Sequence, residues 1–465
     1  MPERGEDLIT DREILSVGRN YSRIERAERV AFLIDGEAYF GAFRAAAERA
    51  QRSILIVGWD VDSRAKLFHD EHDSSGLPAT LGDFLDALVK RRKTLQIHVL
   101  NWDFAMLYAL EREFLPIYAL DWRTHARMHF HLDDVHPVGS SHHQKIVVVD
   151  DAVAFVGGLD LTIRRWDTSE HRPDEPRRVD PAGNAYPPFH DVQMMVDGAA
   201  AEALGDIARE RWQRATGEDL RKPDSRADHD PWPAEVVPDV TDVDVAIART
   251  EPRYAGRQEV REVKQLYIDA IAAARHSIYL ENQYFTSAAV GDALAARLTE
   301  TDGPEIVVVS RLRGGGWLEQ NTMEVLRARL VRRLRDVDRQ GRLQIYCPEH
   351  TGLRDQCIDL HSKLMIVDDR LLRIGSANLA NRSMGLDTEC DLALEATDPR
   401  VARPIVALRN RLLGEHLGVA PEEFGRAFEA KGSLIAAIEA LRVNPRSLAP
   451  LDASLDPALD ALVPD

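Results

Sequence analysis

One short pattern that occurs twice constrains this sequence more than any other feature. Residues 143–150 read HQKIVVVD and residues 361–368 read HSKLMIVD, so His-x-Lys-x4-Asp recurs after 218 residues. Each copy leads at the same offset into a step of small residues, Gly157-Gly158 in the first and Gly375-Ser376 in the second. Only 8 of the 59 basic residues are lysine, yet both copies keep it, which indicates a need for a compact ammonium group. The repetition predicts two similar halves.

The apolar residues after each motif predict the local structure. Apolar runs cover 146–149 and 364–367, an Asp-Asp pair ends each run, and a second apolar run covers 152–156 or 370–374. Two short apolar runs around a polar pair are typical of two strands joined by a tight turn. We therefore expect each motif to lie on the first strand of a hairpin.

Positions within the motif predict which side chains act together. Residues two apart on a strand share a face. Two pairs should therefore project together, His143 with Lys145 and His361 with Lys363. The motif aspartates, Asp150 and Asp368, fall at the turn. Because aspartate side chains commonly hold turn backbone, we expect a structural role for both and no chemistry. His142 should face the opposite side, as a packed histidine.

Other elements recur in the same order and predict the fold. A helical pattern and a buried strand precede each motif, at 40–52 and 54–58 in the first half and at 259–275 and 278–280 in the second. Alternating strands and helices predict an α/β fold. We expect two similar α/β/α sandwich domains with mixed sheets, related by a pseudo-twofold axis. The domains should cover residues 1–221 and 246–465. Residues 222–245 are rich in Pro and Asp and should form the linker.

Composition narrows the function classes. Three scattered cysteines argue against a disulfide framework. The N-terminus has no apolar signal-peptide core, and no apolar run is long enough to span a bilayer, so we expect a cytoplasmic protein. The net charge of −18 weighs against nucleic acid as a partner, because a DNA binder needs basic surface to neutralise phosphates. We expect a monomer.

The duplicated motif resembles the phospholipase D superfamily, whose members carry two HKD motifs. Further segments are similar to the eukaryotic-type branch and its bacterial relatives: ILIVGWDVDSR (54–64), GGLDLTIRRWDT (157–168), PFHDVQMMVDG (188–198) and IYLENQYF (278–285). The resemblance covers residues 30–415, which suggests a catalytic core alone. It implies one active site shared by the two halves at their interface, and no cofactor or metal.

The motif residues suit the cleavage of a phosphodiester without a metal. Such cleavage needs positive charge for the phosphoryl oxygens, a nucleophile, and an acid for the leaving oxygen. Two facing copies supply a histidine that forms a phosphohistidine and another that protonates the leaving alcohol. The lysines would hold the phosphoryl oxygens, together with Asn378. Family precedent favours His143 as the nucleophile and His361 as the acid and base.

Each histidine also needs a partner that sets its tautomer. The resemblance assigns this role to Glu389, which follows His361 by 28 residues. In the first half we choose Asp191, displaced along the chain by an insertion at 169–188. The alternative interpretation is that both acids lie at the surface or at strand ends.

Several weaker candidates surround the motifs. Gly158 and Ser376 belong to the small-residue steps, and Asp160 stands where the second half has Asn378. Asp160 could favour a choline-like cation or merely hold a loop. Aromatic side chains could bind a quaternary ammonium group by cation–π attraction, or could pack in the core. The substrate-binding candidates are Trp59, Trp166, Gln283 and Tyr284.

These observations predict a phospholipase D that converts phosphatidylcholine-like lipids to phosphatidic acid, with possible transfer to alcohols. Its substrate would place the protein peripherally on a phospholipid membrane. The alternative is another HKD phosphodiesterase, either a phosphatidyltransferase similar to cardiolipin synthase or a nuclease. The acidic charge argues against the nuclease, and the lack of N-terminal membrane helices argues against the synthase.

Overall fold

The computed structural model describes residues 13–69, 76–103, 125–223, 229–312, 317–353 and 356–451. Most of its strands form one 16-stranded mixed sheet. The first half contains β1 (Arg23–Ile34), α1 (Asp35–Arg49), β2 (Ser53–Gly58), α2 (Leu81–Arg91), β3 (Gln96–Trp102), β4 (Met128–Asp133), β5 (Ile146–Val149), β6 (Val153–Gly157), β7 (Phe189–His190), β8 (Val192–Asp197) and α3 (Gly198–Thr216).

The second half contains a similar series of elements and further elements at its C-terminal end. It contains β9 (Val240–Glu251), β10 (Val260–Arg261), α4 (Glu262–Ala273), β11 (Ser277–Asn282), α5 (Ala288–Thr299), β12 (Glu305–Val309), α6 (Trp317–Val337), β13 (Leu343–His350), β14 (Asp359–Leu360), β15 (Lys363–Val367), β16 (Leu371–Gly375), β17 (Glu389–Glu395), α7 (Pro399–Leu417), α8 (Pro421–Lys431), α9 (Leu434–Leu441) and β18 (Arg446–Pro450).

The sheet order shows the repeat directly. The first half runs β1-β8-β6-β5-β2-β3-β4, and the second runs β9-β17-β16-β15-β11-β12-β13, followed by β18 at the edge. The two halves join where β1 and β9 pair in antiparallel orientation, with Val30 opposite Val240. The fold class predicted from the sequence, two similar α/β sandwiches, is therefore confirmed, although their strands merge into a single sheet.

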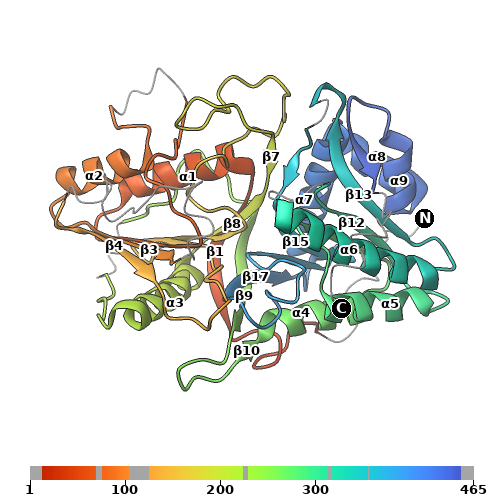
Figure 1. The fold of residues 1–465 in the computed structure, drawn as a ribbon, viewed down its shortest axis with the longest axis horizontal. Helices are drawn as coiled ribbons and strands as arrows, with labels where there is room; N and C mark the ends of the chain where they lie inside the picture. Colours follow the sequence, from red (N-terminus) through yellow and green to blue (C-terminus); the bar gives the residue numbers. More distant parts are fainter. Residues whose placement is uncertain are drawn as a thin grey trace.

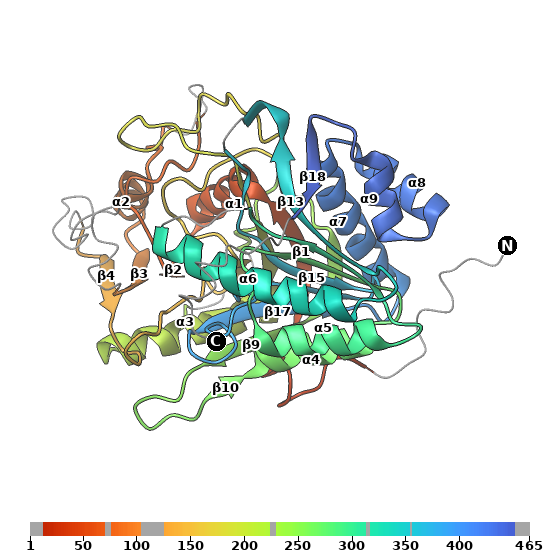
Figure 2. The same cartoon turned by 45° about the vertical axis from the view of Figure 1, so that its right-hand side comes forward.

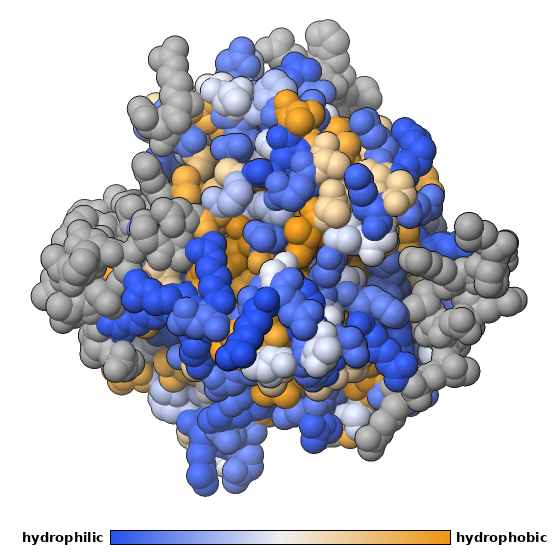
Figure 3. All heavy atoms as spheres, turned by 90° about the vertical axis from the view of Figure 1, so that its right-hand side faces the viewer, coloured by the Kyte–Doolittle hydropathy of each residue, from blue (hydrophilic) through white to orange (hydrophobic). Residues whose placement is uncertain are grey.

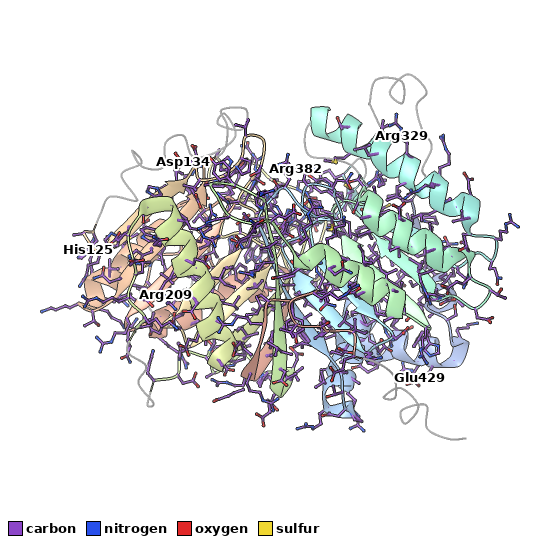
Figure 4. The ribbon with its side chains drawn as sticks, turned by 90° about the horizontal axis from the view of Figure 1, so that it is seen from below. His125, Asp134, Arg209, Arg329, Arg382 and Glu429 are labelled. Atoms are coloured by element: carbon purple, nitrogen blue, oxygen red, sulfur yellow. The ribbon has the colours of Figure 1, made fainter. Side chains whose placement is uncertain are left out.

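Helices cover both faces of each half (Figures 1 and 2). In the first half α1 and α2 pack on one face and α3 on the other; in the second, α4, α5 and α6 lie opposite α7, α8 and α9. Seen from below, Arg209 lies on α3 and Arg382 lies near the junction of the halves (Figure 4). The central strands are covered on both sides, which explains why β5 is uniformly apolar and buried and why β15 is apolar and buried after Lys363.

Two details differ from the sequence prediction. Residues 240–245, assigned to the linker, form the first part of β9 and pair with β1, because their alternating pattern supplies one buried face of the sheet. The first H-x-K also precedes its strand, since β5 begins at Ile146. In the second half Lys363 is the first residue of β15. The histidines thus lie just outside the sheet edge, where loops can bring them together.

The surface over the second half of the molecule carries both hydrophilic and apolar side chains. The face over the second half shows hydrophilic side chains across most of its area with apolar side chains between them (Figure 3). Among the described residues, no helix combines the length and the apolarity needed to cross a bilayer.

Candidate active site

The imidazole of His143 is held by a carboxylate from the other half of the molecule. His143 Nδ1 lies 3.0 Å from Glu389 Oε2, and Glu389 is fully buried at the start of β17. Ser376 Oγ donates to the same carboxylate oxygen at 2.5 Å. Burial acts to raise the pKa of Glu389, but His143 and the hydroxyl of Ser376 outweigh it, so this pKa lies below its usual value. Glu389 therefore stays ionised and can stabilise a protonated His143.

The second histidine has the matching arrangement with the halves exchanged. His361 Nδ1 lies 2.7 Å from Asp191 Oδ2, and Asp191 is fully buried between β7 and β8. Gly158 makes this approach possible, because a Cβ atom there would lie 2.2 Å from Asp191 Oδ1. Burial raises the pKa of Asp191 to about 6, against the opposing effect of Lys363.

The orienting carboxylates are thus the two that the sequence analysis chose, but their pairing crosses between the halves. Backbone contacts fix this exchange. Short parallel strands β7 and β14 pair across the interface, and His361 N donates to His190 O at 2.8 Å. On the other side, His143 N donates to Thr388 O at 3.0 Å. The shared site at the interface is built from both halves at once.

The two motif lysines have unequal surroundings. Lys145 Nζ lies 3.0 Å from Asp160 Oδ2, and both side chains are buried. Asp160 Oδ1 also accepts a hydrogen bond from Trp59 N at 2.9 Å. Lys363 contacts Gln283 Oε1 at 3.3 Å and His361 Nδ1 at 3.0 Å, and forms no ion pair with any described carboxylate. The acid at 160 therefore neutralises one lysine and holds a loop.

The unpaired lysine perturbs its neighbour. Burial lowers the pKa of Lys363 to about 7, although Asp191 opposes the shift. Burial, then Lys363 and Arg165, lower the pKa of His361 well below its usual value. His361 is accordingly neutral near pH 7, which is the form a nucleophile requires.

The lysine pKa predicts a pH dependence. Lys363 must be protonated to attract phosphoryl oxygens, so kcat/KM should fall as the pH rises through about 7. A bound phosphate anion favours the protonated lysine, so the fall in kcat should lie at higher pH. The rates of hydrolysis of a soluble diester between about pH 5.5 and 9 measure the decrease of kcat/KM and the decrease of kcat. Lys363→Arg should move the kcat/KM limb upward, because guanidinium does not titrate in this range. A flat kcat/KM profile up to pH 9 would contradict this prediction.

The motif aspartates hold backbone, as the sequence suggested. Asp150 accepts hydrogen bonds from the backbone N–H groups of Gln51, Arg52 and Ser53, all between 2.6 and 2.7 Å. Asp368 accepts them from residues 275–277 in the same way. Each carboxylate thus ties its hairpin turn to the loop before the neighbouring strand, β2 or β11. His142 is buried next to Asp133 and faces away from His143.

The remaining candidates divide between the site and the core. Asn378 is nearly buried, and its side-chain Oδ1 has no hydrogen-bond partner among the described residues. Trp59 lies edge-on to His143, with ring centroids 6.3 Å apart, and stacks on Trp102. Tyr284 lies under Arg311. Trp166 is buried against His69 and Arg177, so core packing describes its position better than substrate contact.

A group of buried side chains next to Asp191 could hold a metal ion. Its members are Asp35, His171, His190 and Glu415, whose ligand atoms all lie within 4.8 Å of one another. His190 Nδ1 lies 2.9 Å from both Asp35 Oδ1 and Glu415 Oε1. The other ring nitrogen of each histidine also contacts a carboxylate. His171 Nδ1 lies 2.9 Å from Asp167 Oδ2, and His190 Nε2 lies 3.1 Å from Glu281 Oε2. Metal-binding histidines commonly have such partners.

Protonated histidines can neutralise the carboxylates of this cluster without a metal ion. Burial acts to lower the pKa of His171, but Asp35, Asp167 and Glu415 raise it to about 9, so this histidine carries a proton at neutral pH. The family resemblance implied no metal, and no local motif predicted this cluster. Its four residues come from segments far apart in the chain. The chemistry proposed below uses none of them.

Comparisons with known proteins identify families and relatives that this chain resembles. Residues 121–293 match the family described as phospholipase D, and residues 267–410 match the family described as cardiolipin synthase, PLD-like domain. Phospholipase D alpha 1 of Vigna unguiculata is 25% identical, over 81% of this chain and 63% of its own length. Phospholipase D A of Dictyostelium discoideum is also 25% identical, over 84% of this chain and 36% of its own length. The chain thus spans less than two thirds of these relatives.

A solved structure shares the fold. Phosphatidylserine synthase of Haemophilus influenzae Rd KW20 superposes with a TM-score of 0.57 at 12% identity, covering 90% of this chain and 96% of the synthase. This likeness extends over both halves of the molecule and speaks for the fold alone. His143 and His361 each lie inside a matched family segment. The repeated motif, the two crossed histidine–carboxylate pairs and these matches together show that the chain belongs to the phospholipase D superfamily.

Proposed function

We propose that this protein is a phospholipase D, which hydrolyses the distal phosphodiester bond of phosphatidylcholine-like glycerophospholipids to phosphatidic acid and the free headgroup. The observation that carries the proposal is the pair of histidines, each oriented by a buried carboxylate of the other half and each followed by a buried lysine. The curated relatives named phospholipase D support the substrate class.

The geometry suits a double displacement. One histidine attacks phosphorus with its neutral Nε2, a phosphorus–nitrogen bond forms, and the bond to the headgroup oxygen breaks. The other histidine donates its proton to that oxygen. It then removes a proton from water, whose oxygen attacks phosphorus and breaks the phosphorus–nitrogen bond. The buried carboxylates stabilise each imidazolium form in turn, while Lys363 and Asn378 face the phosphoryl oxygens.

Capture of the intermediate by an alcohol tests this function. Phosphatidylcholine vesicles containing a small primary alcohol should give the phosphatidyl-alcohol beside phosphatidic acid, with retention of configuration at phosphorus. Two in-line displacements give retention, whereas direct attack by water gives inversion. Inversion in a chirally labelled substrate would overturn the covalent route. The absence of any alcohol adduct at high alcohol would leave hydrolysis intact and remove the transferase activity.

The second candidate function is another HKD phosphodiesterase. Residues 267–410 match the family described as cardiolipin synthase, PLD-like domain, which makes a phosphatidyltransferase the specific alternative. The same vesicles supplied with serine or glycerol, beside a digest of single-stranded DNA, separate these activities. Phosphatidic acid as the main product in every lipid reaction supports the hydrolase. A dominant serine or glycerol adduct would replace it by the transferase, and cleaved DNA would point to a nuclease.

A further inference from the structure

The two motif lysines alone supply too little positive charge to neutralise the phosphoryl group. Asp160 neutralises Lys145, and Lys363 loses its proton near pH 7. A phosphodiester is an anion at any pH near neutrality, and a phosphomonoester product carries more negative charge still. A site that binds both needs a cation that neither titrates nor is already paired.

Arg165 supplies such a cation. Its side chain is partly buried, and its guanidinium carbon lies 4.8 Å from the centre of the Phe189 ring. The Phe189 ring centre lies in turn 5.4 Å from that of His361. The charge of Arg165 is among the causes that lower the pKa values of His361 and Lys363. Arg165 thus lies on the His361 side of the site, although it belongs to the first half.

Most of the hydrogen-bonding capacity of Arg165 is unused. Nη1 donates to Arg164 O at 3.2 Å, and the guanidinium forms no ion pair within the part of the chain that the structure describes. Its neighbour differs: Arg164 Nη2 is paired with Asp180 Oδ2 at 2.6 Å and half of its side chain is exposed. A guanidinium that lies over an aromatic ring keeps its N–H groups at the edge available for a bidentate contact with phosphate.

The backbone at this position is held closely by the beginning of α1. A Cβ atom on Gly36 would lie 2.3 Å from Arg165 O and 2.7 Å from Trp166 Cα, so only glycine allows the contact. The next residue, Glu37, donates its N–H to Asp167 O at 2.9 Å. The backbone of Arg165 is therefore held in place before any substrate arrives, and its guanidinium lies over Phe189, which lowers the entropic cost of a contact with a ligand.

We propose that Arg165 is a third basic contact for the phosphoryl group, beside the two motif lysines, and that it binds the non-bridging oxygens of the phosphodiester and of the phosphomonoester product. This inference rests on the proposed function for its substrate. The anion site itself can be tested without turnover.

The test compares Arg165→Gln with Arg164→Gln, its matched control, in the full chain. Inorganic phosphate binding is measured by calorimetry, and kcat and KM are measured on a soluble phosphodiester. Loss of a charge-assisted contact should weaken phosphate binding by about 10- to 100-fold in Arg165→Gln. Arg164→Gln should bind phosphate within about twofold of the wild type, since the Arg164 guanidinium is already paired with Asp180. The loss of kcat/KM in Arg165→Gln should grow above pH 7, where Lys363 loses its proton.

Arg165→Lys keeps the charge without the planar fork and should bind phosphate with intermediate affinity. If Arg165→Gln fails to fold, Arg165→Lys still allows phosphate binding to be measured. Wild-type phosphate affinity in a folded Arg165→Gln or Arg165→Lys would overturn the inference. If the wild type cleaved no phosphodiester while Arg165→Gln still lost phosphate binding, the anion site would stand and the proposed function would fall.

Discussion

Replacing either His143 or His361 by alanine should reduce the turnover of a lipid diester by more than about 10⁴-fold. A general acid or base alone contributes about 10²–10⁴-fold, and here each histidine is needed in both displacements. The crossed carboxylates make the two losses comparable, because each half holds the histidine of the other. Headgroup release from phosphatidylcholine vesicles measures the effect. His276→Ala is the control, since this histidine is exposed and its hydrogen bonds with Asp368 and Glu305 are made by its backbone.

An aryl diester separates the two histidine roles. Its leaving group needs no proton, so the variant lacking the acid should still release aryl alcohol in one burst and accumulate phosphoenzyme. The variant lacking the nucleophile should release none. A burst from His361→Ala would agree with the role that the resemblance gives to His143, and a burst from His143→Ala would agree with the neutral His361 of the structure. Either variant retaining more than about a tenth of wild-type turnover on lipid would contradict the two-histidine mechanism.

The sequence predicted the repeat and its elements well, because those follow from local pattern. The hairpins after each motif and the helices before them depend on residues close together in the chain. The motif aspartates lie at these turns, although the backbone N–H groups that they bind belong to residues 98 and 91 positions earlier, such as Arg52 and Ser277. The boundary of the linker was misplaced because residues 240–245 are polar on one face. Only their pairing with β1 shows that the other face belongs to the sheet.

The sequence predicted the two histidines and the two carboxylates that orient them, but it did not predict which carboxylate pairs with which histidine. Sequence alone does not say whether Glu389 meets the histidine of its own half or the one across the interface. The same holds for Asp160, whose pairing with Lys145 depends on how the loop after β6 folds back. The cluster of Asp35, His171, His190 and Glu415 joins four distant segments, two of them at the ends of the 169–188 insertion. The only indication of this cluster in the sequence is the segment PFHD (188–191), in which His190 directly precedes Asp191.

A buried ion pair beneath the second motif should contribute the largest single effect on stability. Arg373 and Asp391 are fully buried; Arg373 Nε donates to Asp391 Oδ2 at 2.7 Å and its Nη1 donates to Lys363 O at 3.1 Å. Asp391 Oδ1 accepts the N–H groups of Ser376 and Ala377, just before Asn378. The pair therefore connects the motif lysine to the loop that carries Asn378.

Arg373→Ala leaves Asp391 charged in the core, so the free energy of unfolding should fall by about 3–5 kcal/mol. Chemical denaturation measures this value. Arg333→Ala is the matched control, because it breaks a pair that is largely exposed to solvent and should cost less than about 1 kcal/mol. Arg373→Met combined with Asp391→Asn should recover part of the loss, since no lone charge then remains. A cost for Arg373→Ala no larger than that for Arg333→Ala would mean that water reaches Asp391 once the guanidinium is gone. The second motif would then depend on Asp368 and the sheet alone for its position.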